Sequence, residues 1–185
     1  SAEDLLDLKT YEDSFSEFLR LDAVVKNASE AVRMVSSQPQ TKKMKMGLQK
    51  AVSITINSIS AQSGSALKKK VTTLLTLLSG GSVSIGNDSV TTHGIPEAIM
   101  FCKNLTAKKL HVVAQADSQV SCNPCTAFPY AVVMVSLMNT NSELRDLILA
   151  YFYIQCPYLL PYYPAKQPEQ STEEEMKRTY KGKEM

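Results

Sequence analysis

Residues 18–37, FLRLDAVVKNASEAVRMVSS, carry the first strong periodic pattern of the chain. Their apolar side chains recur every three or four residues, a spacing that places one apolar stripe along an α-helix. The stripe is formed by Phe18, Leu21, Val25, Ala28, Val32 and Val35. The pattern predicts a long helix from about Tyr11 to Ser37, ended by Pro39 because proline cannot continue a helix. Such a stripe is also typical of the end of a coiled coil.

Beyond this stretch, five further segments have helical periodicity and are bounded by cap residues, prolines or glycines. They cover about 42–59, 65–79, 96–116, 129–138 and 142–156. Ser65 and Ser142 are the expected N-cap residues, while Pro96 and Pro129 suit a first helical turn. One local conflict remains, because the run SITINSIS, residues 53–60, is rich enough in β-branched side chains to form a strand instead.

The arrangement of these segments indicates an all-α fold, because strands and helices do not alternate along the chain. The polar, turn-rich residues 80–95 predict a surface loop or a small hairpin. Successive amphipathic pairs indicate a HEAT-like helical repeat, an α-solenoid, more than a four-helix bundle. We expect an N-terminal helix over 1–38, a helical domain over 39–168 and a C-terminal tail or helix over 169–185. No capping helix is evident after that tail, which predicts a partial domain.

Composition narrows the class of protein. The chain has 185 residues, of which 44% are hydrophobic, which suits one domain with a real core. No apolar run reaches the ~18 residues that a membrane span needs, so no membrane partner is expected. The opening residues are acidic and do not resemble a secretory signal. The four cysteines are therefore expected as reduced thiols.

Charge is distributed unevenly along the chain. Residues 1–30 hold eight acidic and three basic side chains, whereas residues 31–87 hold eight basic side chains and no acidic one. At the chain average of 18 acids in 185 residues, the second stretch should hold about five or six. Two readings follow: a solvated helical face paired with the acidic opening segment, or a docking surface for a polyanion or an acidic partner. In either case no carboxylate within the stretch neutralises it locally.

The basic cluster of Lys42, Lys43, Lys45 and Lys50 is the candidate binding site. It lies within one to two turns of a predicted helix start, where the helix dipole also favours anions. By contrast, residues 68–70 are three successive lysines that cannot share one helical face. Residues 31–87 contain no aromatic side chain on which bases could stack, which argues against sequence-specific RNA binding.

Candidate catalytic chemistry has little support. Cys122 and Cys125 have the spacing of a redox or metal motif, but His93 and His111 do not complete a zinc site. There is no Gly-x-Ser-x-Gly element, and acidic residues avoid the middle of the chain. We therefore expect no enzyme and no metal; a thiol-redox enzyme is the remotest alternative.

Three ordered segments carry a resemblance to a known family. They are LQKAVSITINSISAQSGSALKKKVTTLLTLLSGGSV (48–83), AFPYAVVMVSLM (127–138) and LRDLILAYFYIQCPYLLPYYP (144–164). Together they resemble the C-terminal domain of the Gle-one family of nuclear-pore mRNA-export factors, in its animal branch, over about residues 42–180. Members of that family continue well beyond the last of these segments, so the resemblance implies a domain cut after its first half.

The resemblance implies a HEAT-like repeat and a non-enzymatic regulator that stimulates a DEAD-box RNA-dependent ATPase of mRNA export. It implies localisation at the cytoplasmic face of the nuclear pore complex, in nucleus and cytoplasm. It also implies nucleoporins as partners, with RNA contacted only indirectly. In fungal members inositol hexakisphosphate bridges the two proteins, and by position that role falls on Lys42, Lys43, Lys45 and Lys50. The alternatives are a helical protein-interaction scaffold without polyphosphate binding and a basic nucleic-acid-binding module.

Overall fold

The structure is a computed structural model of the chain, and it describes residues 2–37, 41–60, 63–114 and 123–156. The elements in chain order are α1 (Ala2–Ser37), α2 (Lys42–Asn57), α3 (Gly64–Leu78), β1 (Ser82–Ile85), β2 (Asp88–Thr91), α4 (Pro96–Val113), the 3-10 helix η2 (Pro124–Thr126), α6 (Ala127–Thr140) and α7 (Ser142–Gln155). The predicted all-α class is confirmed for these residues, in which a single small hairpin is the only sheet. The repeat type stays a prediction.

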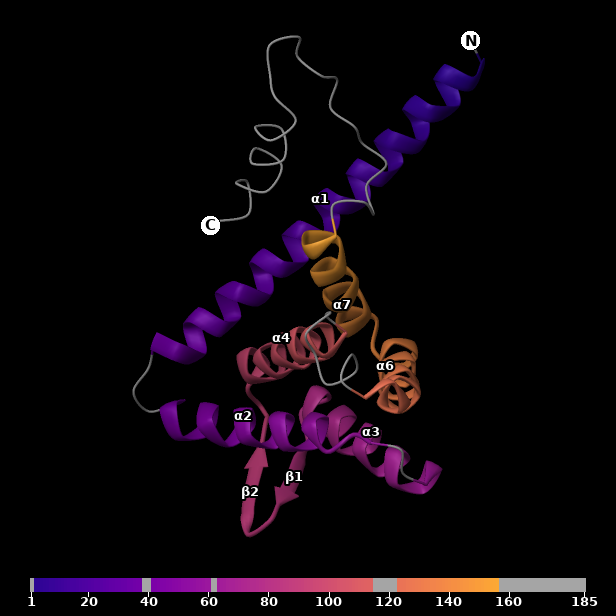
Figure 1. Cartoon of the computed structure of the whole chain (residues 1–185). Helices are drawn as coiled ribbons and strands as arrows, with labels where there is room; N and C mark the ends of the chain where they lie inside the picture. The colour runs from indigo at the N-terminus through magenta and orange to yellow at the C-terminus, as the bar shows by residue number, and fades with distance from the viewer. Residues whose placement is uncertain (1, 38–40, 61–62, 115–122, 157–185) are drawn as a thin grey trace, which may run out of the picture.

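Helix α1 is the long N-terminal helix, and it begins nine residues earlier than the predicted Tyr11. Its C-terminal half packs on α4 and α7, while its N-terminal half extends away from the other described elements (Figure 1). The predicted stripe is confirmed, because Leu21, Ala28 and Val35 are buried at intervals of seven residues. A salt bridge of 2.7 Å between Arg20 and Asp146 adds a polar link to α7.

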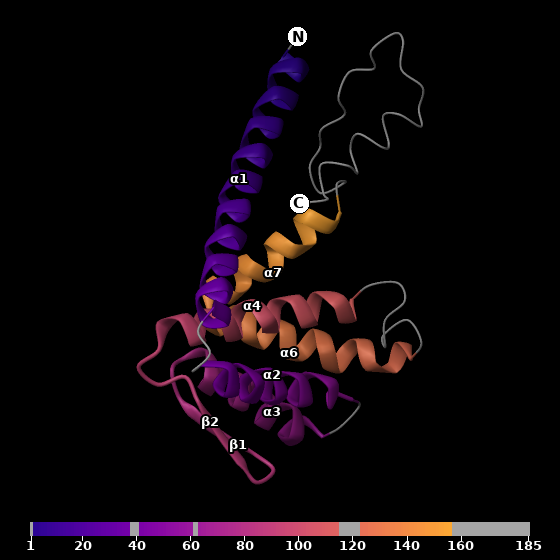
Figure 2. The ribbon, with the colours of Figure 1, turned by 90° about the vertical axis from the view of Figure 1, so that its left-hand side faces the viewer.

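Helices α2 and α3 form one layer, and α4 and α6 lie over it (Figure 2). The SITINSIS run is helical as far as Asn57, so its strand alternative is wrong. Thr55, a β-branched residue, is buried in this helix. Its hydroxyl donates to the Ala51 carbonyl at 2.8 Å, which satisfies the buried polar group. The N-cap of helix α3 lies two residues before the expected one: the hydroxyl of Ser63, not Ser65, accepts from the Ala66 amide.

Residues 80–95 form a hairpin, the second of the two predicted outcomes. β1 and β2 are antiparallel, with Ile85 opposite Asp88, which leaves a two-residue turn of Gly86 and Asn87. Gly86 has φ of 63°, as the first position of a type II′ turn requires, and glycine reaches that region at little cost. The base of the hairpin is tied to α3, because the buried Thr92 hydroxyl donates to the Leu77 carbonyl at 2.8 Å.

Helix α4 is the centre of the described part, packed against α1, α2, α3 and α7. Two predicted helix starts are corrected here. Helix α6 begins before Pro129, which is its third residue, and α7 is capped by Asn141 rather than Ser142, since the Asn141 side chain accepts from the Leu144 amide at 2.9 Å. None of the helices in the described ranges has the length and apolarity that a membrane crossing requires.

Candidate polyanion-binding surface

Three of the four predicted lysines share the exposed side of α2. Lys42, Lys43 and Lys50, here called the lysine face, are all exposed, whereas Leu48 and Val52 are fully buried on the opposite side. Helical geometry places Lys43 and Lys50 almost in line, because seven residues are close to two turns. This stretch folds that way because its apolar residues recur at helical spacing and leave the lysines facing solvent.

Lys45 does not belong to this surface. It is half-buried, and its ammonium donates to the Ser36 hydroxyl at 2.8 Å, at the end of α1. The predicted cluster is therefore divided: Lys45 links α2 to α1, while the other three lysines form the exposed lysine face.

The acidic opening segment does not neutralise the lysine face. Its described carboxylates pair within α1 instead, as in Glu17 with Arg20 at 2.7 Å and Glu30 with Arg33 at 2.6 Å. The hydrogen bond from Arg33 lowers the pKa of Glu30 from its ordinary value. Among the α1 side chains that the structure describes, no acid pairs with Lys42, Lys43 or Lys50, which argues against the reading of a helical face paired with that segment.

A different carboxylate reaches the face, and the sequence reading missed it. Asp88, the first acidic residue after the acid-free stretch, lies 2.8 Å from the Lys50 ammonium. The pKa of Asp88 is lowered by the hydrogen bond from Lys50, then by the charge of Lys50 and by that of Lys43. The neutralising carboxylate thus comes from outside residues 31–87, which themselves hold no acidic side chain. The turn sequence Ile85-Gly86-Asn87-Asp88 was the available signal, because it marks a hairpin that can return a strand to α2.

The beginning of α2 adds a further attraction for anions. No acidic residue lies in its first turn, and the Thr41 side chain does not cap it. Instead the Thr41 hydroxyl donates to the Val35 carbonyl. The first amides of a helix carry partial positive charge, so this end and Lys42 act in the same direction.

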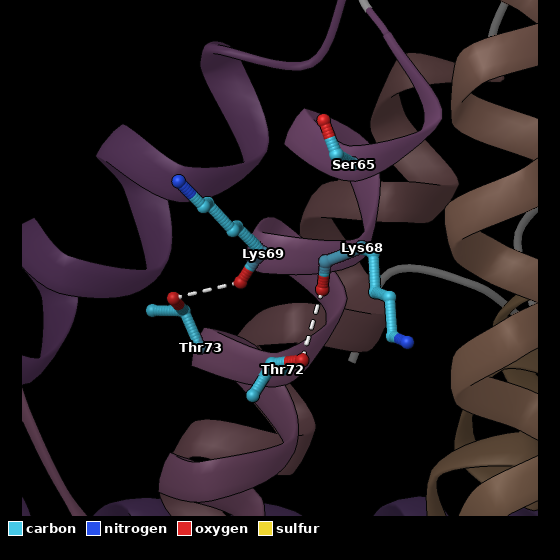
Figure 3. A pocket seen from close by; sticks show the side chains of 5 residues that line it. All are labelled: Ser65, Lys68, Lys69, Thr72 and Thr73. Atoms are coloured by element: carbon cyan, nitrogen blue, oxygen red, sulfur yellow. Dashed lines mark hydrogen bonds between the residues drawn. The ribbon is translucent and has the colours of Figure 1, made fainter.

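The second lysine group, on α3, is not convergent. Ser65, Lys68, Lys69, Thr72 and Thr73 line a hollow in which the two ammonium groups point apart (Figure 3). The hydroxyls of Thr72 and Thr73 donate to the backbone carbonyls of Lys68 and Lys69, so they face their own helix. This arrangement agrees with the prediction that three successive lysines cannot share one face.

Those of the remaining candidate residues that the structure describes form no catalytic constellation. Cys125 is exposed, Cys102 is buried with a thiol pKa raised to about 12 by burial, and Cys122 lies outside the described residues. His93 is exposed in a turn, and His111 is buried. Within the described ranges, no three histidine, cysteine, aspartate or glutamate side chains gather in a way that could hold a metal ion.

Comparison with known proteins places these features in a family. The profile of GLE1-like proteins matches residues 23–183. The chain is 39% identical over 130 residues to mRNA export factor GLE1 of Mus musculus, an alignment that covers 70% of this chain and 18% of the mouse protein. It is 34% identical over 138 residues to the Danio rerio protein, covering 75% of this chain and 20% of that one. It is 29% identical over 155 residues to Drosophila melanogaster Gle1, an alignment that covers 84% of this chain and 23% of the fly protein.

The chain thus spans about a fifth of the length of these relatives. The profile match nevertheless runs from the middle of α1 through every later described element. This protein belongs to the GLE1-like family.

Proposed function

We propose that this chain is part of an mRNA export factor that binds and stimulates a DEAD-box RNA-dependent ATPase, without being an enzyme itself. Its relatives are mRNA export factors, which supports the role in export. The family resemblance supports the ATPase as partner, nucleoporins as neighbours, and the cytoplasmic face of the nuclear pore complex as the place of action. RNA is then contacted indirectly, through the ATPase.

The lysine face is the proposed contact to that partner, directly or through a bridging inositol hexakisphosphate. The observation that carries this proposal is that Lys42, Lys43 and Lys50 are exposed on one side of α2, whose first turn holds no acidic residue. Several ammonium groups near a helix N-terminus suit a compact polyphosphate or an acidic protein surface.

Stimulation of an ATPase requires more than tight binding. A ligand shifts a conformational equilibrium only by its difference in affinity for the two states. A rigid helical body that grips one lobe of the ATPase would therefore have to favour the open arrangement, in which product leaves, over the closed one.

The binding part is tested by thermal shift with inositol hexakisphosphate. A ligand of the folded state raises the melting temperature, so the unchanged chain should show a rise that disappears in Lys43→Gln/Lys50→Gln. The control is Lys68→Gln/Lys69→Gln, which removes the same charge from the non-convergent group on α3. Equal rises in both variants would reject the lysine face as the binding site.

The regulatory part is tested by ATPase stimulation in a full-length relative carrying the equivalent substitutions. We expect reduced stimulation and a weaker dependence on salt for the α2 variant only, because exposed charges are screened by ions. Titration of short RNA separates the nucleic-acid alternative, since direct phosphate binding would show a steep salt dependence.

One observation favours a second candidate, a protein-interaction scaffold without polyphosphate binding. Helix α6 contains no charged residue, and it presents Phe128, Val132 and Val135 to solvent, Phe128 with 80% of its surface exposed. An apolar stripe of this kind is typical of a protein contact. In this case Phe128→Ser/Val135→Ser would abolish stimulation while Lys43→Gln/Lys50→Gln would leave it intact.

A further inference from the structure

The carboxylate that meets the lysine face is unusual in the sequence. Asp88 is the only acidic residue between Glu30 and Glu97. Two-residue turn geometry and pairing with β1 place it at the start of β2, and the Lys50 ammonium reaches it at 2.8 Å. The acid therefore lies where a ligand of the lysine face would place its own negative charge.

The hairpin does not depend on this ion pair for its position. Val90 packs against α2 at Gly47, where an added Cβ would lie 2.8 Å from a Val90 methyl carbon. Thr92 anchors the end of the hairpin, with its amide donating to the Gly81 carbonyl at 3.1 Å and its hydroxyl donating to the Leu77 carbonyl. Apolar packing and hydrogen bonds thus hold the hairpin in place, so the charge of Asp88 is not required for its position.

The ion pair itself is one that an external anion can replace. The side chains of Lys50 and Asp88 are 56% and 64% exposed. Pairs of this kind are largely hydrated and contribute little to stability, so breaking them costs little. Lys43 also acts on Asp88 through its charge, which means that one carboxylate is shared by two lysines of the face.

We propose that Asp88 is a built-in competitor for the lysine face, an internal anion that a phosphate group of the ligand must displace. This inference rests on the proposed binding of a polyphosphate. In the free protein Asp88 forms an ion pair with Lys50, and its negative charge also reduces the positive potential around Lys43. In the complex a phosphate takes its place, and the residual negative charge of Asp88 weakens the affinity. Asp88 therefore sets how much polyphosphate is needed to load the surface.

The experiment is calorimetric titration of inositol hexakisphosphate into the unchanged chain and Asp88→Asn. Removing one negative charge a few ångströms from a multiply charged ligand should tighten binding about three- to tenfold at moderate salt. The matched control is Asp13→Asn, in the extended half of α1. It removes the same charge about 36 Å along the helix from Ser37, so its affinity should stay unchanged.

A second substitution tests the route of the effect. In a Lys50→Gln background, Asp88→Asn should gain less than in the unchanged chain, because the pair that it breaks is already absent. Carboxyl NMR gives an independent readout: the pKa of Asp88 is low in the free protein because of Lys50 and Lys43, and it should rise when the polyphosphate displaces it.

The outcomes separate the two proposals. If the unchanged chain and Asp88→Asn both fail to bind, the proposed polyphosphate function is rejected. If the unchanged chain binds and Asp88→Asn binds equally well, or no better than Asp13→Asn, the competitor role is rejected while the function stands. Tighter binding of Asp88→Asn that persists undiminished in the Lys50→Gln background also rejects the proposed route.

Discussion

Two lysine–carboxylate pairs in this molecule look alike in the sequence and behave differently in the structure. Lys103 of α4 pairs with Glu143 at the start of α7; 11% of the lysine side chain is exposed, whereas 61% of the glutamate side chain is. Lys50 of α2 pairs with Asp88 of the hairpin, and both side chains are mostly exposed. The two pairs therefore differ in the burial of the lysine, not of the carboxylate. The first pair is part of the packing of two helices. The second lies on the surface, where water and ions compete with it.

Burial of the lysine determines which charges are available for function. A buried ammonium that loses its partner has no replacement at hand, so the protein must keep the pair intact. An exposed pair can exchange its carboxylate for another anion. Binding sites for soluble anions are therefore expected at the second kind of pair, which is where the family resemblance also placed one.

The largest effect on stability is expected from Glu143→Gln. It leaves the ammonium of Lys103 without a carboxylate, so the free energy of unfolding should fall by about 2 to 3 kcal/mol in urea titration. The double variant Lys103→Met/Glu143→Gln removes the buried charge as well and should recover most of the loss. A single variant as stable as the double one would show that Lys103 is not effectively buried.

A smaller loss is expected from Gly47→Leu. Any side chain at Gly47 meets Val90, so leucine should push β2 from α2 and lower the free energy of unfolding by about 1 to 2 kcal/mol. The pKa of Asp88 should then return toward its ordinary value, because Lys50 no longer reaches it. Gly64→Leu is the control, since a Cβ at Gly64 meets nothing within 4 Å. Equal losses in the two variants would contradict the close packing of hairpin and helix.

A pH effect is expected at the α4–α7 end, where His111 is buried. Neither ring nitrogen has a hydrogen-bond partner among the described residues. The Phe152 ring lies edge-on to the His111 ring, with the two ring centres 4.9 Å apart. Burial lowers the pKa of His111 below 6.5, so the unfolded state binds the proton more readily than the folded one. Stability is therefore full above about pH 6.5 and declines as the pH falls below that value.

The measurement for His111 is the melting temperature between pH 7.5 and 5.5. It should fall with pH in the unchanged chain and fall less in His111→Phe, which keeps an aromatic ring beside Phe152. The Tyr151 ring stacks on His111 with the ring centres 6.3 Å apart, and the Lys108 ammonium lies 5.6 Å from the centre of the Tyr151 ring. Parallel curves for the two proteins would show that His111 is solvated.

The smallest effect on stability is expected from Asp88→Asn. Exposed ion pairs contribute little, so the urea midpoint should match that of the unchanged chain while polyphosphate affinity rises. A clear loss of stability would mean that the Lys50 pair holds the hairpin in place. In that case the contrast with Lys103 and Glu143 would disappear.

Much of the fold could be predicted because helical periodicity is local. The stripe through Leu21, Ala28 and Val35, the hairpin near Gly86 and the core positions of α7 all follow from spacing within one segment. Helix starts were less accurate, with Ser63 and Asn141 acting as caps in place of Ser65 and Ser142. Neighbouring residues with equal capping ability compete, and tertiary packing selects between them.

The candidate site was predicted as a set of lysines, and its composition changed in three dimensions. Apolar spacing within α2 assigns its buried side, so local pattern alone predicts that this acid-free helix presents several ammonium groups to solvent. The contacts of Lys45 with Ser36 and of Lys50 with Asp88, 38 residues away, arise only from the packing of the elements. The physical reason is that a charge acts over a few ångströms of space, and that distance is set by how the hairpin packs on α2, which no local pattern encodes.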